Sequence, residues 1–436
     1  MSLPRLPFDP SCCLIGGEWQ NSVSLEKLEL INPSDGSILT EIASGNENDI
    51  DAAITSAQYA FEQCWSTTPA AERGRILSNL GRLILKNIDL LSTLEALDVG
   101  KPFTQAQADV RALARYMEFY GGAADKVHGE TIPYLEGYTV YTLREPHGVT
   151  GHIVPWNYPM QIIGRSVGAA LAMGNSCVLK PAEEACLTAL TFANLALEAG
   201  LPAGVLNVVP GLGATAGSAL CANKGINHIS FTGSVATGRL VQAAAAYNIV
   251  PVTLELGGKS PQLFFEDANL ENALPFLVNA GIQNGGQTCS ASSRILVHRS
   301  RYDEVVDHMS KRYKELIVRP AIEDGALGPL ISERQKLIVE DFISKGQNLN
   351  LVAQGEIDGN VPENGHYVAP HLFADVSDDH ILAKNEIFGP VQVIMAFDTE
   401  EEAIDIANGT DYGLVASIWT NDGARQMRLA KKLKSG

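Results

Sequence analysis

Residues 148–180 read GVTGHIVPWNYPMQIIGRSVGAALAMGNSCVLK, so a β-branched run, a helical stretch that starts at Pro159 and a second β-rich run follow one another. The alternation continues with VLNVVP (205–210), HISFTG (228–233) and PVTLEL (251–256), separated by helical sequence. Apolar runs that alternate with helices, at about 25 residues a unit, are typical of a parallel sheet covered by helices on both faces. We therefore predict an α/β fold with a doubly wound parallel sheet.

The flanking sequence adds a helical region, an arm and a second α/β pattern. Residues 49–120 have apolar positions at helical spacing, with Asp49 as the expected N-cap. In GETIPYLEGYTVYTLREPHG (129–148) strand formers alternate with turn formers, which predicts a β-hairpin arm around 123–146 that pairs with another subunit. After Gly257 we expect strands at QLFF (262–265) and RILVHR (294–299), and helices near 269–284, 302–317 and 332–346.

Composition and charge exclude several classes of partner. The 436 residues carry a formal net charge of -18, which repels polyanions, so we expect no nucleic acid partner. No apolar stretch reaches the roughly 18 residues that a membrane span needs, and no membrane association is expected. The seven cysteines form no CxxC pair, which favours free thiols in a reducing compartment and predicts a cytoplasmic location. No Cys/His group has zinc-ligand spacing, so no metal is predicted.

The segment Asn284-Gly-Gly-Gln-Thr-Cys-Ser290 is the most specific in the chain. Small neighbours allow a ligand and backbone amides to approach the Cys289 sulfur closely, and a thiolate is a nucleophile when its surroundings lower its pKa. Cys289 is therefore a candidate nucleophile. The alternative is that Cys289 is a buried small hydrophobic residue, as most cysteines are.

Glu255 ends the apolar run Thr253-Leu-Glu-Leu256 and is followed by two glycines. A carboxylate at the carboxyl end of a parallel strand faces the crevice where such sheets bind ligands. The alternative is a structural ion pair with an Arg or Lys, because an unpaired buried carboxylate is costly.

Asn157 lies in Val154-Pro-Trp-Asn-Tyr-Pro159, where two prolines end the first strand. The side-chain amide of an asparagine can donate to a developing oxyanion. The alternative is a turn in which Asn157 caps the helix that begins at Pro159.

Taken together, PWNYP, LKPAE, FTGSVATG, LELGGKSP, GQTCS and NEIFGPV, in this order and over essentially the whole chain, resemble the aldehyde dehydrogenase superfamily. The resemblance implies oxidation of an aldehyde to a carboxylic acid with NAD. It implies that Cys289 attacks the carbonyl, that the Asn157 side chain and the Cys289 amide hold the oxyanion, and that Glu255 activates the water that hydrolyses the thioester.

The resemblance also implies a coenzyme site. Glu386 and Phe388 are similar to the residues that hold the nicotinamide ribose and ring. Glu183, three residues after Lys180, can bind the adenosine ribose hydroxyls, and its charge favours NAD over NADP. If Glu183 is instead only a helix-start acid, this preference stays open. The remaining cofactor-binding positions are Trp156, Lys180, Gly213, Phe231, Gly233, Ser234, Gly238 and Leu256.

Substrate choice is less well indicated by the sequence. Arg165 lies where some semialdehyde-oxidising relatives also carry arginine, and a guanidinium there can pair with a substrate carboxylate. The alternative is that Arg165 pairs with an acid of the protein. Tyr158, Thr288 and Ser290 are expected to line the substrate tunnel, but such walls suit many aldehydes.

The expected organisation is an NAD-binding domain (1–122 and 147–256), an oligomerisation arm (123–146) and a catalytic domain (257–436), with the active site between the two domains and a homodimer or homotetramer as the assembly. The chain ends at KKLKSG, where members of the family continue with a tail. The alternatives are therefore a catalytically impaired protein with a structural or binding role, or a CoA-acylating relative, against which Glu255 argues.

Overall fold

The computed structural model describes residues 3–436, which divide into two compact units. Unit 1 comprises the chain up to Ile31, Ile38–Asp98 and Thr104–Glu255. Unit 2 comprises Asn32–Ser37, Val99–Phe103 and Leu256–Gly436. The sequence division placed all of residues 1–122 in the first domain, whereas two short segments of that region belong to unit 2.

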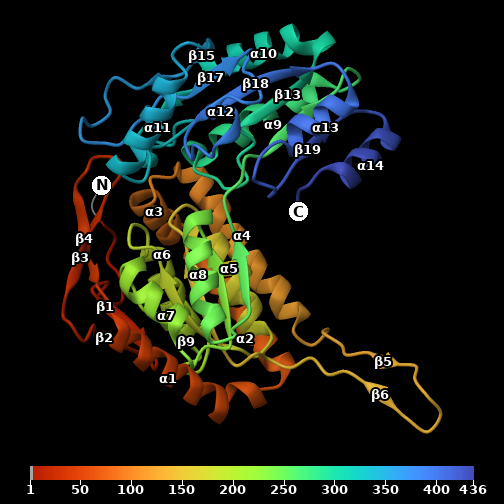
Figure 1. Cartoon of the computed structure of the whole chain (residues 1–436). Coiled ribbons are helices and arrows are strands. Elements are labelled where there is room, and N and C mark those ends of the chain that lie inside the picture. Colours follow the sequence, from red (N-terminus) through yellow and green to blue (C-terminus); the bar gives the residue numbers. More distant parts are fainter. Residues whose placement is uncertain (1–2) are drawn as a thin grey trace. The chain divides into compact units, whose positions relative to one another are not determined.

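Unit 1 is built on a mostly parallel sheet, as predicted (Figure 1). Within residues 3–436 this sheet has seven strands in the order β11-β10-β7-β8-β9-β1-β2. The parallel strands are β7 (Val149–Val154), β8 (Ser176–Pro181), β9 (Leu206–Val208), β10 (His228–Thr232) and β11 (Val252–Glu255). The chain adds β8 and β9 on one side of β7, and β10 and β11 on the other. This reversal makes the sheet doubly wound.

At the β9 edge an antiparallel hairpin extends the sheet. It consists of β1 (Cys12–Ile15) and β2 (Glu18–Asn21), and β1 pairs with β9. A separate antiparallel pair forms from β3 (Lys27–Ile31) and β4 (Ile38–Ala43). None of these strands was predicted from the sequence.

Helices cover the sheet of unit 1. They are α5 (Pro159–Ala172), α6 (Leu187–Glu198), α7 (Ser218–Ala222) and α8 (Val235–Tyr247) between the parallel strands, preceded by α1 (Glu47–Gln63), α2 (Ala70–Lys86), α3 (Ile88–Asp98) and α4 (Phe103–Ala123). Leu179 of β8 and Phe192 of α6 are fully buried in one core cluster with side chains of α2 and α4. Burial of each such side chain stabilises the fold by about 1.5–3 kcal/mol.

The first helix does not begin as predicted. Asn46 is the N-cap of α1, and its side chain accepts a hydrogen bond from the Asn48 N–H. Asp49 lies three residues later and completes a capping box by accepting from the Asn46 N–H at 2.9 Å. The prediction of Asp49 as the N-cap was therefore wrong, because Asn46 has the extended backbone that an N-cap requires.

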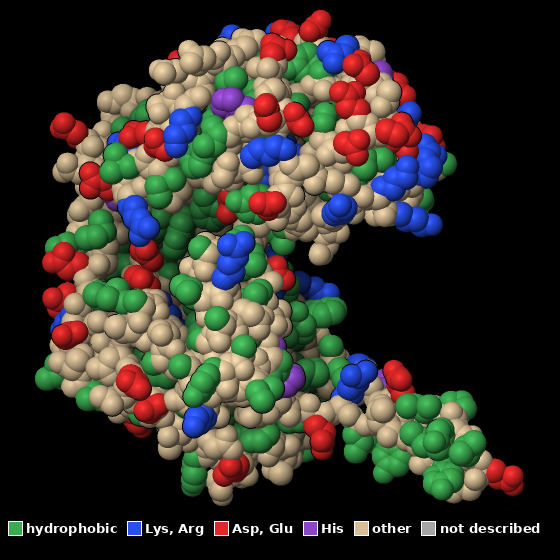
Figure 2. All heavy atoms as spheres, in the orientation of Figure 1, with side chains coloured by type: hydrophobic (Ala, Val, Ile, Leu, Met, Phe, Trp, Pro, Cys, Tyr) green, Lys and Arg blue, Asp and Glu red, His purple; other side chains and the backbone are tan. Residues whose placement is uncertain are grey.

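The predicted hairpin arm is present in unit 1. Its strands β5 (Thr131–Ile132) and β6 (Val140–Tyr141) are antiparallel and short. Apolar side chains gather on it (Figure 2), and Tyr134, Leu135 and Tyr138 are between 64% and 69% exposed.

Unit 2 contains a second doubly covered sheet, which within the described residues has six strands in the order β15-β17-β18-β13-β12-β19. Alternate residues of β12 and β13 enter different core clusters: Leu263 and Leu296 pack on one side, and Phe264 and Ile295 on the other. The strands are β12 (Pro261–Phe264), β13 (Arg294–His298), β15 (Asn350–Gln354), β17 (His371–Ala374), β18 (Val391–Phe397) and β19 (Ser417–Trp419), beside a small pair, β14 (Ile317–Val318) and β16 (Glu356–Ile357).

The helices of unit 2 are close to their predicted positions. α9 (Leu270–Ile282), α10 (Tyr302–Lys314) and α11 (Glu333–Lys345) are followed by α12 (Ile381–Lys384), α13 (Glu400–Asn408) and α14 (Gly423–Lys432). α10 ends earlier than predicted because Ile317 and Val318 form β14. Among the helices that the structure describes, none combines the length and the apolar character that a membrane crossing requires.

Candidate functional site

The carboxyl ends of β7 and β10 form the topological switch point of the unit 1 sheet. β7 leads into Trp156, Asn157 and Tyr158, and β10 leads into Gly233 and Ser234. Since successive connections leave these neighbouring strands on opposite faces of the sheet, ligands of such sheets bind at this edge. Asn157 and Tyr158 are buried, with 5% and 9% exposed.

The helix start beside this edge is suited to hold a phosphate. Ser234 is the N-cap of α8, and its hydroxyl accepts from the Thr237 N–H at 3.2 Å. The Gly233 N–H donates to the Glu255 carbonyl at 3.0 Å, which fixes the approach to the helix. An α-helix of this length offers oriented N–H groups and a positive dipole end to an anion. Phe231 lies in β10, and Gly238 is buried in the second turn of α8.

Tyr158, and not Asn157, is the N-cap of α5, and within residues 3–436 no side-chain cap hydrogen bond forms there. Pro159 occupies the first helical turn, where its missing N–H costs nothing. The capping role considered for Asn157 is therefore not what the structure has.

Lys180 and Glu183 form an ion pair at the end of β8. The Lys180 Nζ lies 2.7 Å from the Glu183 Oε2, and the Glu183 Oε1 accepts from the Gly213 N–H at 3.5 Å. Lys180 is buried, whereas 29% of the Glu183 side chain is exposed. Glu183 precedes α6 by several residues, so it is not an acid in the first turn of that helix.

Glu255 is the last residue of β11 and pairs with Thr232 of β10. Its side chain is exposed, and within the described chain no basic side chain forms an ion pair with it. The carboxylate thus lies at the carboxyl edge of the parallel sheet, as predicted, without the structural ion pair that was the alternative.

In unit 2 the candidate nucleophile follows a tightly wound turn. Asn284, Gly285 and Gly286 have left-handed backbones, with φ values of 51°, 63° and 74°. Gln287 is fully buried and locks this turn: its Nε2 donates to the Asn284 carbonyl at 2.9 Å, and its Oε1 accepts from the Ile331 N–H at 3.0 Å. The turn leaves Cys289 partly exposed.

Thr288 and Ser290 flank this cysteine and are also partly exposed. The Thr288 hydroxyl donates to the Gln283 carbonyl at 3.2 Å. The sequence did not single out Gln287, although a large polar residue between Gly286 and Thr288 was a usable signal.

The two glycines after Leu256 are required by close contacts within unit 2. A Cβ on Gly257 would lie 2.0 Å from the Glu386 Oε2, and a Cβ on Gly258 would lie 2.4 Å from the Cys289 carbonyl oxygen. The Gly258 N–H donates to the Glu386 Oε1 at 3.1 Å. The backbone of these glycines therefore lies between the candidate nucleophile and the Glu386 carboxyl.

Glu386 and Phe388 belong to the loop between α12 and β18. Burial raises the pKa of the Glu386 carboxyl to about 7, although the Gly258 N–H and Lys259 oppose the rise. Phe388 has a φ of 56°, a strained value for an aromatic residue, and its carbonyl accepts from the Gln335 Nε2 at 2.9 Å.

Burial makes two other cysteines poor nucleophiles. Cys177 is fully buried in β8, and burial raises the pKa of its thiol to about 12. Burial raises the pKa of Cys221 to about 11. A thiol with so high a pKa is protonated at neutral pH and is not nucleophilic.

Arg165 is exposed on α5, two turns from its start. Its Nε donates to the Tyr116 hydroxyl at 3.0 Å, and one terminal nitrogen donates to the Gln161 Oε1 at 3.3 Å. The guanidinium carbon lies 5.8 Å from the centre of the Tyr116 ring. Among residues 3–436, no group of His, Cys, Asp and Glu side chains is arranged to hold a metal ion.

Comparisons with known proteins agree on one family. The model of the aldehyde dehydrogenase family matches residues 19–436. Cytosolic aldehyde dehydrogenase 1 of Rattus norvegicus is 40% identical, covering 100% of this chain and 87% of that protein.

Two solved structures are similar over nearly the whole chain. A Burkholderia cenocepacia protein described as an aldehyde dehydrogenase is 56% identical with a TM-score of 0.97, covering 98% of this chain and 90% of that one. The NAD+ complex of an aldehyde dehydrogenase from Bacillus cereus is 39% identical with a TM-score of 0.95, covering 100% and 90%.

Proposed function

Because the chain belongs to the aldehyde dehydrogenase family and oxidises an aldehyde to a carboxylic acid with NAD, we propose that Cys289 is the nucleophile, Asn157 the oxyanion donor and Glu255 the base of this reaction. The observation that carries the proposal is the backbone at Cys289. A left-handed turn precedes Cys289 and Gly258 is packed against its carbonyl, so the backbone that carries this partly exposed residue is held in place.

The first half of the reaction is oxidation of the aldehyde to a thioester on sulfur. The Cys289 thiolate attacks the carbonyl carbon and forms a C–S bond, and the carbonyl oxygen becomes an oxyanion. The Asn157 side-chain amide donates to that oxyanion, a contact worth about 2.7–4 kcal/mol of barrier. NAD, when bound, supplies the acceptor for the hydride of the same carbon, and a thioester remains on Cys289.

The second half is hydrolysis. Glu255 accepts a proton from a water molecule whose oxygen attacks the thioester carbon, and the C–S bond breaks to release the acid and the Cys289 thiolate. An exposed carboxylate that no described basic side chain engages in an ion pair is free to accept a hydrogen bond from such a water molecule.

The described residues fit NAD on three counts. The α8 N-terminus with Ser234 suits a pyrophosphate, the half-exposed Glu183 suits the adenosine ribose, and Glu386 suits the nicotinamide ribose. Trp156, Gly213, Phe231, Gly238, Leu256 and Phe388 complete the proposed coenzyme site.

We expect NAD in preference to NADP, since the Glu183 carboxylate repels a 2′-phosphate. Lys180 offsets part of that charge. Glu183→Gln should therefore raise kcat/KM for NADP relative to NAD, and an unchanged ratio would remove Glu183 from coenzyme discrimination.

NADH formation from a panel of aldehydes tests the mechanism, with Cys289→Ala beside wild type. Cys64→Ala is the matched control, because Cys64 is also partly exposed but lies at the end of α1. Turnover should vanish in Cys289→Ala and persist in Cys64→Ala. Glu255→Gln should give a burst of roughly one equivalent of NADH followed by little turnover, because the thioester accumulates. Full turnover by Cys289→Ala would overturn the proposal.

We propose a semialdehyde that carries a carboxylate as the substrate class. Its support is Arg165, which is exposed and whose planar guanidinium is oriented by Tyr116 and Gln161. A charge-assisted hydrogen bond contributes about 1.5–3 kcal/mol, so kcat/KM should be about 10- to 100-fold higher for succinic semialdehyde than for an uncharged aldehyde of equal length. Arg165→Met should abolish this preference, and the exposed Arg115→Met should not. Equal kcat/KM values in wild type would refute the assignment.

A homodimer or homotetramer is proposed for the assembly. Its support is apolar exposure on the hairpin arm and on α8, where Leu240 and Tyr247 are 72% and 86% exposed. Sedimentation of wild type and of Tyr138→Ser tests it: the variant should dissociate more readily, and a monomeric wild type would contradict it. A cytoplasmic location is also proposed, supported by seven free cysteines in the described chain.

A further inference from the structure

Two buried glutamines hold the helix that leads to Cys289. Gln262 of β12 and Gln392 of β18 are 1% and 0% exposed. The Gln262 Nε2 donates to the Phe276 carbonyl at 3.2 Å, and the Gln392 Nε2 donates to the next carbonyl, that of Leu277, at 2.9 Å. A glutamine is seldom buried completely, because its polar atoms must then find partners within the protein. Both amides thus fix α9 against the sheet of unit 2.

Gln392 also reaches the chain beyond this helix. Its Nε2 donates to the Ser292 carbonyl at 2.6 Å as well as to the Leu277 carbonyl. Between these two carbonyls lie residues 283–291, which we call the cysteine loop. One amide nitrogen therefore joins the two ends of this loop. The Ser292 N–H donates to the Ala280 carbonyl at 3.0 Å and closes the loop through the backbone as well.

The neighbours of Gln392 leave its amide one orientation. The hydroxyl of Tyr313, a fully buried residue of α10, donates to the Gln392 Oε1. With the oxygen held there, the N–H bonds of the amide nitrogen point to the two carbonyls, whereas a reversed amide would face them with its oxygen. The helix leaves space for the amide, since a Cβ on Gly281 would lie 2.0 Å from the Gln392 Cδ.

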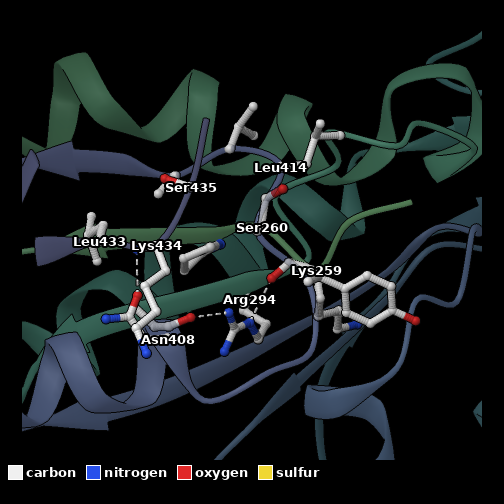
Figure 3. Close-up of a pocket in the computed structure, with 14 residues that line it drawn as sticks. Lys259, Ser260, Arg294, Asn408, Leu414, Leu433, Lys434 and Ser435 are labelled. Atoms are coloured by element: carbon white, nitrogen blue, oxygen red, sulfur yellow. Dashed lines mark hydrogen bonds between the residues drawn. The ribbon is translucent and has the colours of Figure 1, made fainter. Parts of the chain in front are cut away.

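A buried arginine anchors the strand that follows the cysteine loop. Arg294 begins β13, and its Nε and one terminal nitrogen donate to the Lys259 and Ala407 carbonyls at 2.9 and 2.8 Å (Figure 3). Lys259 directly follows Gly258, which is packed against the Cys289 carbonyl. The far side of the loop is therefore fixed by buried contacts that lie within unit 2.

We propose that Gln392 is a positioning residue for catalysis: because its amide joins both ends of the cysteine loop, it holds the Cys289 sulfur where it can attack the aldehyde. The inference rests on the proposed role of Cys289 as the nucleophile. Misplacement of a reacting atom by about 1 Å can cost about 100-fold in rate. Tyr313 contributes by orienting the amide. Gln262 does not, because its amide nitrogen donates to the helix before the loop.

The test is the rate of NADH formation in a single turnover with enzyme in excess. This rate reports attack by Cys289 and hydride transfer, without hydrolysis of the thioester. Gln392→Met keeps the size of the side chain but removes the shared donor, and the rate should fall about 10- to 100-fold. Tyr313→Phe keeps the amide but releases its oxygen, and the rate should fall about 3- to 10-fold. The dissociation constant of NADH should stay close to the wild-type value in both variants.

Gln262→Met is the matched control. Gln262 is equally buried, its Oε1 accepts from the Trp419 Nε1 at 3.0 Å, and its Nε2 donates to the carbonyl that precedes Leu277. Loss of either glutamine should therefore destabilise the fold to a similar extent, but Gln262→Met should keep the wild-type single-turnover rate. If Gln392→Met does not fold, as judged by circular dichroism, Tyr313→Phe is the variant compared with this control.

Two results would overturn the inference. If folded Gln392→Met and Gln262→Met lose the same fraction of the single-turnover rate, Gln392 is only structural. If folded Gln392→Met, or Tyr313→Phe in its place, keeps the wild-type rate, the cysteine loop does not depend on this amide. Failure of the proposed function is recognised separately, because Cys289→Ala would then retain turnover, and the inference would fail with it.

Discussion

Replacement of Gly258 by alanine would show how firmly unit 2 holds Cys289, the proposed nucleophile. The new Cβ would lie 2.4 Å from the Cys289 carbonyl oxygen and 3.2 Å from the Leu414 Cβ. Ordinary contact of a Cβ begins near 3.4 Å, so the backbone at Cys289 must move by about 1 Å. The hydrogen bond from the Gly258 N–H to Glu386 restrains the backbone of Gly258. We therefore expect the backbone of Cys289 to move more than that of Gly258.

The magnitude follows from that displacement. Misplacement of a reacting group by about 1 Å can cost about 10²-fold in rate, because the near-attack geometry is lost. Overpacking of this kind costs about 1–3 kcal/mol in the free energy of unfolding, which a chain with cores of this size tolerates. We therefore expect Gly258→Ala to fold, and its kcat to fall about 100-fold.

The assay is kcat at saturating NAD and aldehyde, with circular dichroism as the measure of folding. The rate at which iodoacetamide alkylates Cys289 is a second, independent measure of the reactivity of this thiol. Gly122→Ala is the matched control, because no heavy atom of the described residues lies within 4 Å of the Cβ it would add. A folded Gly258→Ala with wild-type kcat would refute the idea that this glycine is needed for the cysteine.

Three further outcomes are expected. Burial lowers the pKa of His152 to about 3, so its contribution to stability is complete above pH 6.5 and is lost as the pH falls toward 3. The unfolding free energy of His152→Leu should fall less steeply in this range than that of wild type, and equal slopes would contradict the reasoning. Iodoacetamide at pH 7.5 should label Cys289 before the buried Cys177 in peptide mass spectra, and the reverse order would exclude Cys289 as the reactive thiol. Asp49→Ala should lower the free energy of unfolding, measured by urea titration, by about 1–3 kcal/mol, because the N–H groups of Val23 and Asn46 lose their acceptor. A smaller loss would mean that water replaces the carboxylate as the acceptor.

The parallel strands of unit 1 were predictable because each is a β-rich run between helices and most are buried, as in Ser176–Pro181. The order of these strands in the sheet could not be predicted, because it depends on which face of the sheet each connecting segment crosses and not on local composition. The four-residue strands β1 and β2 carry too little periodicity to be recognised. At the start of α1, Asn46 and Asp49 are both capping residue types, so composition alone could not choose between them.

The candidate reactive side chains are easier to single out in the sequence than the residues that hold them. Cys289, Glu255 and Asn157 each lie within two or three residues of a glycine or proline, which mark unusual backbone in any sequence. Arg294, by contrast, has no glycine or proline within three residues in the sequence. The contacts of Arg294 with Ile406 and Ala407 join residues more than 100 positions apart, and such pairings become visible only in the folded chain.

Residues 257–259 are packed so closely that the first two positions have no room for a side chain. Gly257 lies against the Glu386 carboxyl, Gly258 against the Cys289 carbonyl, and Lys259 is fixed by Arg294. The first two contacts are shorter than any Cβ allows, so a side chain at either position must displace one of its neighbours. Because these contacts are so close, a shift of the Glu386 carboxyl is passed through this segment to the backbone of Cys289, the proposed nucleophile. Substitutions at Gly258 and Glu386 should for this reason be non-additive in kcat, because they act on one connected segment.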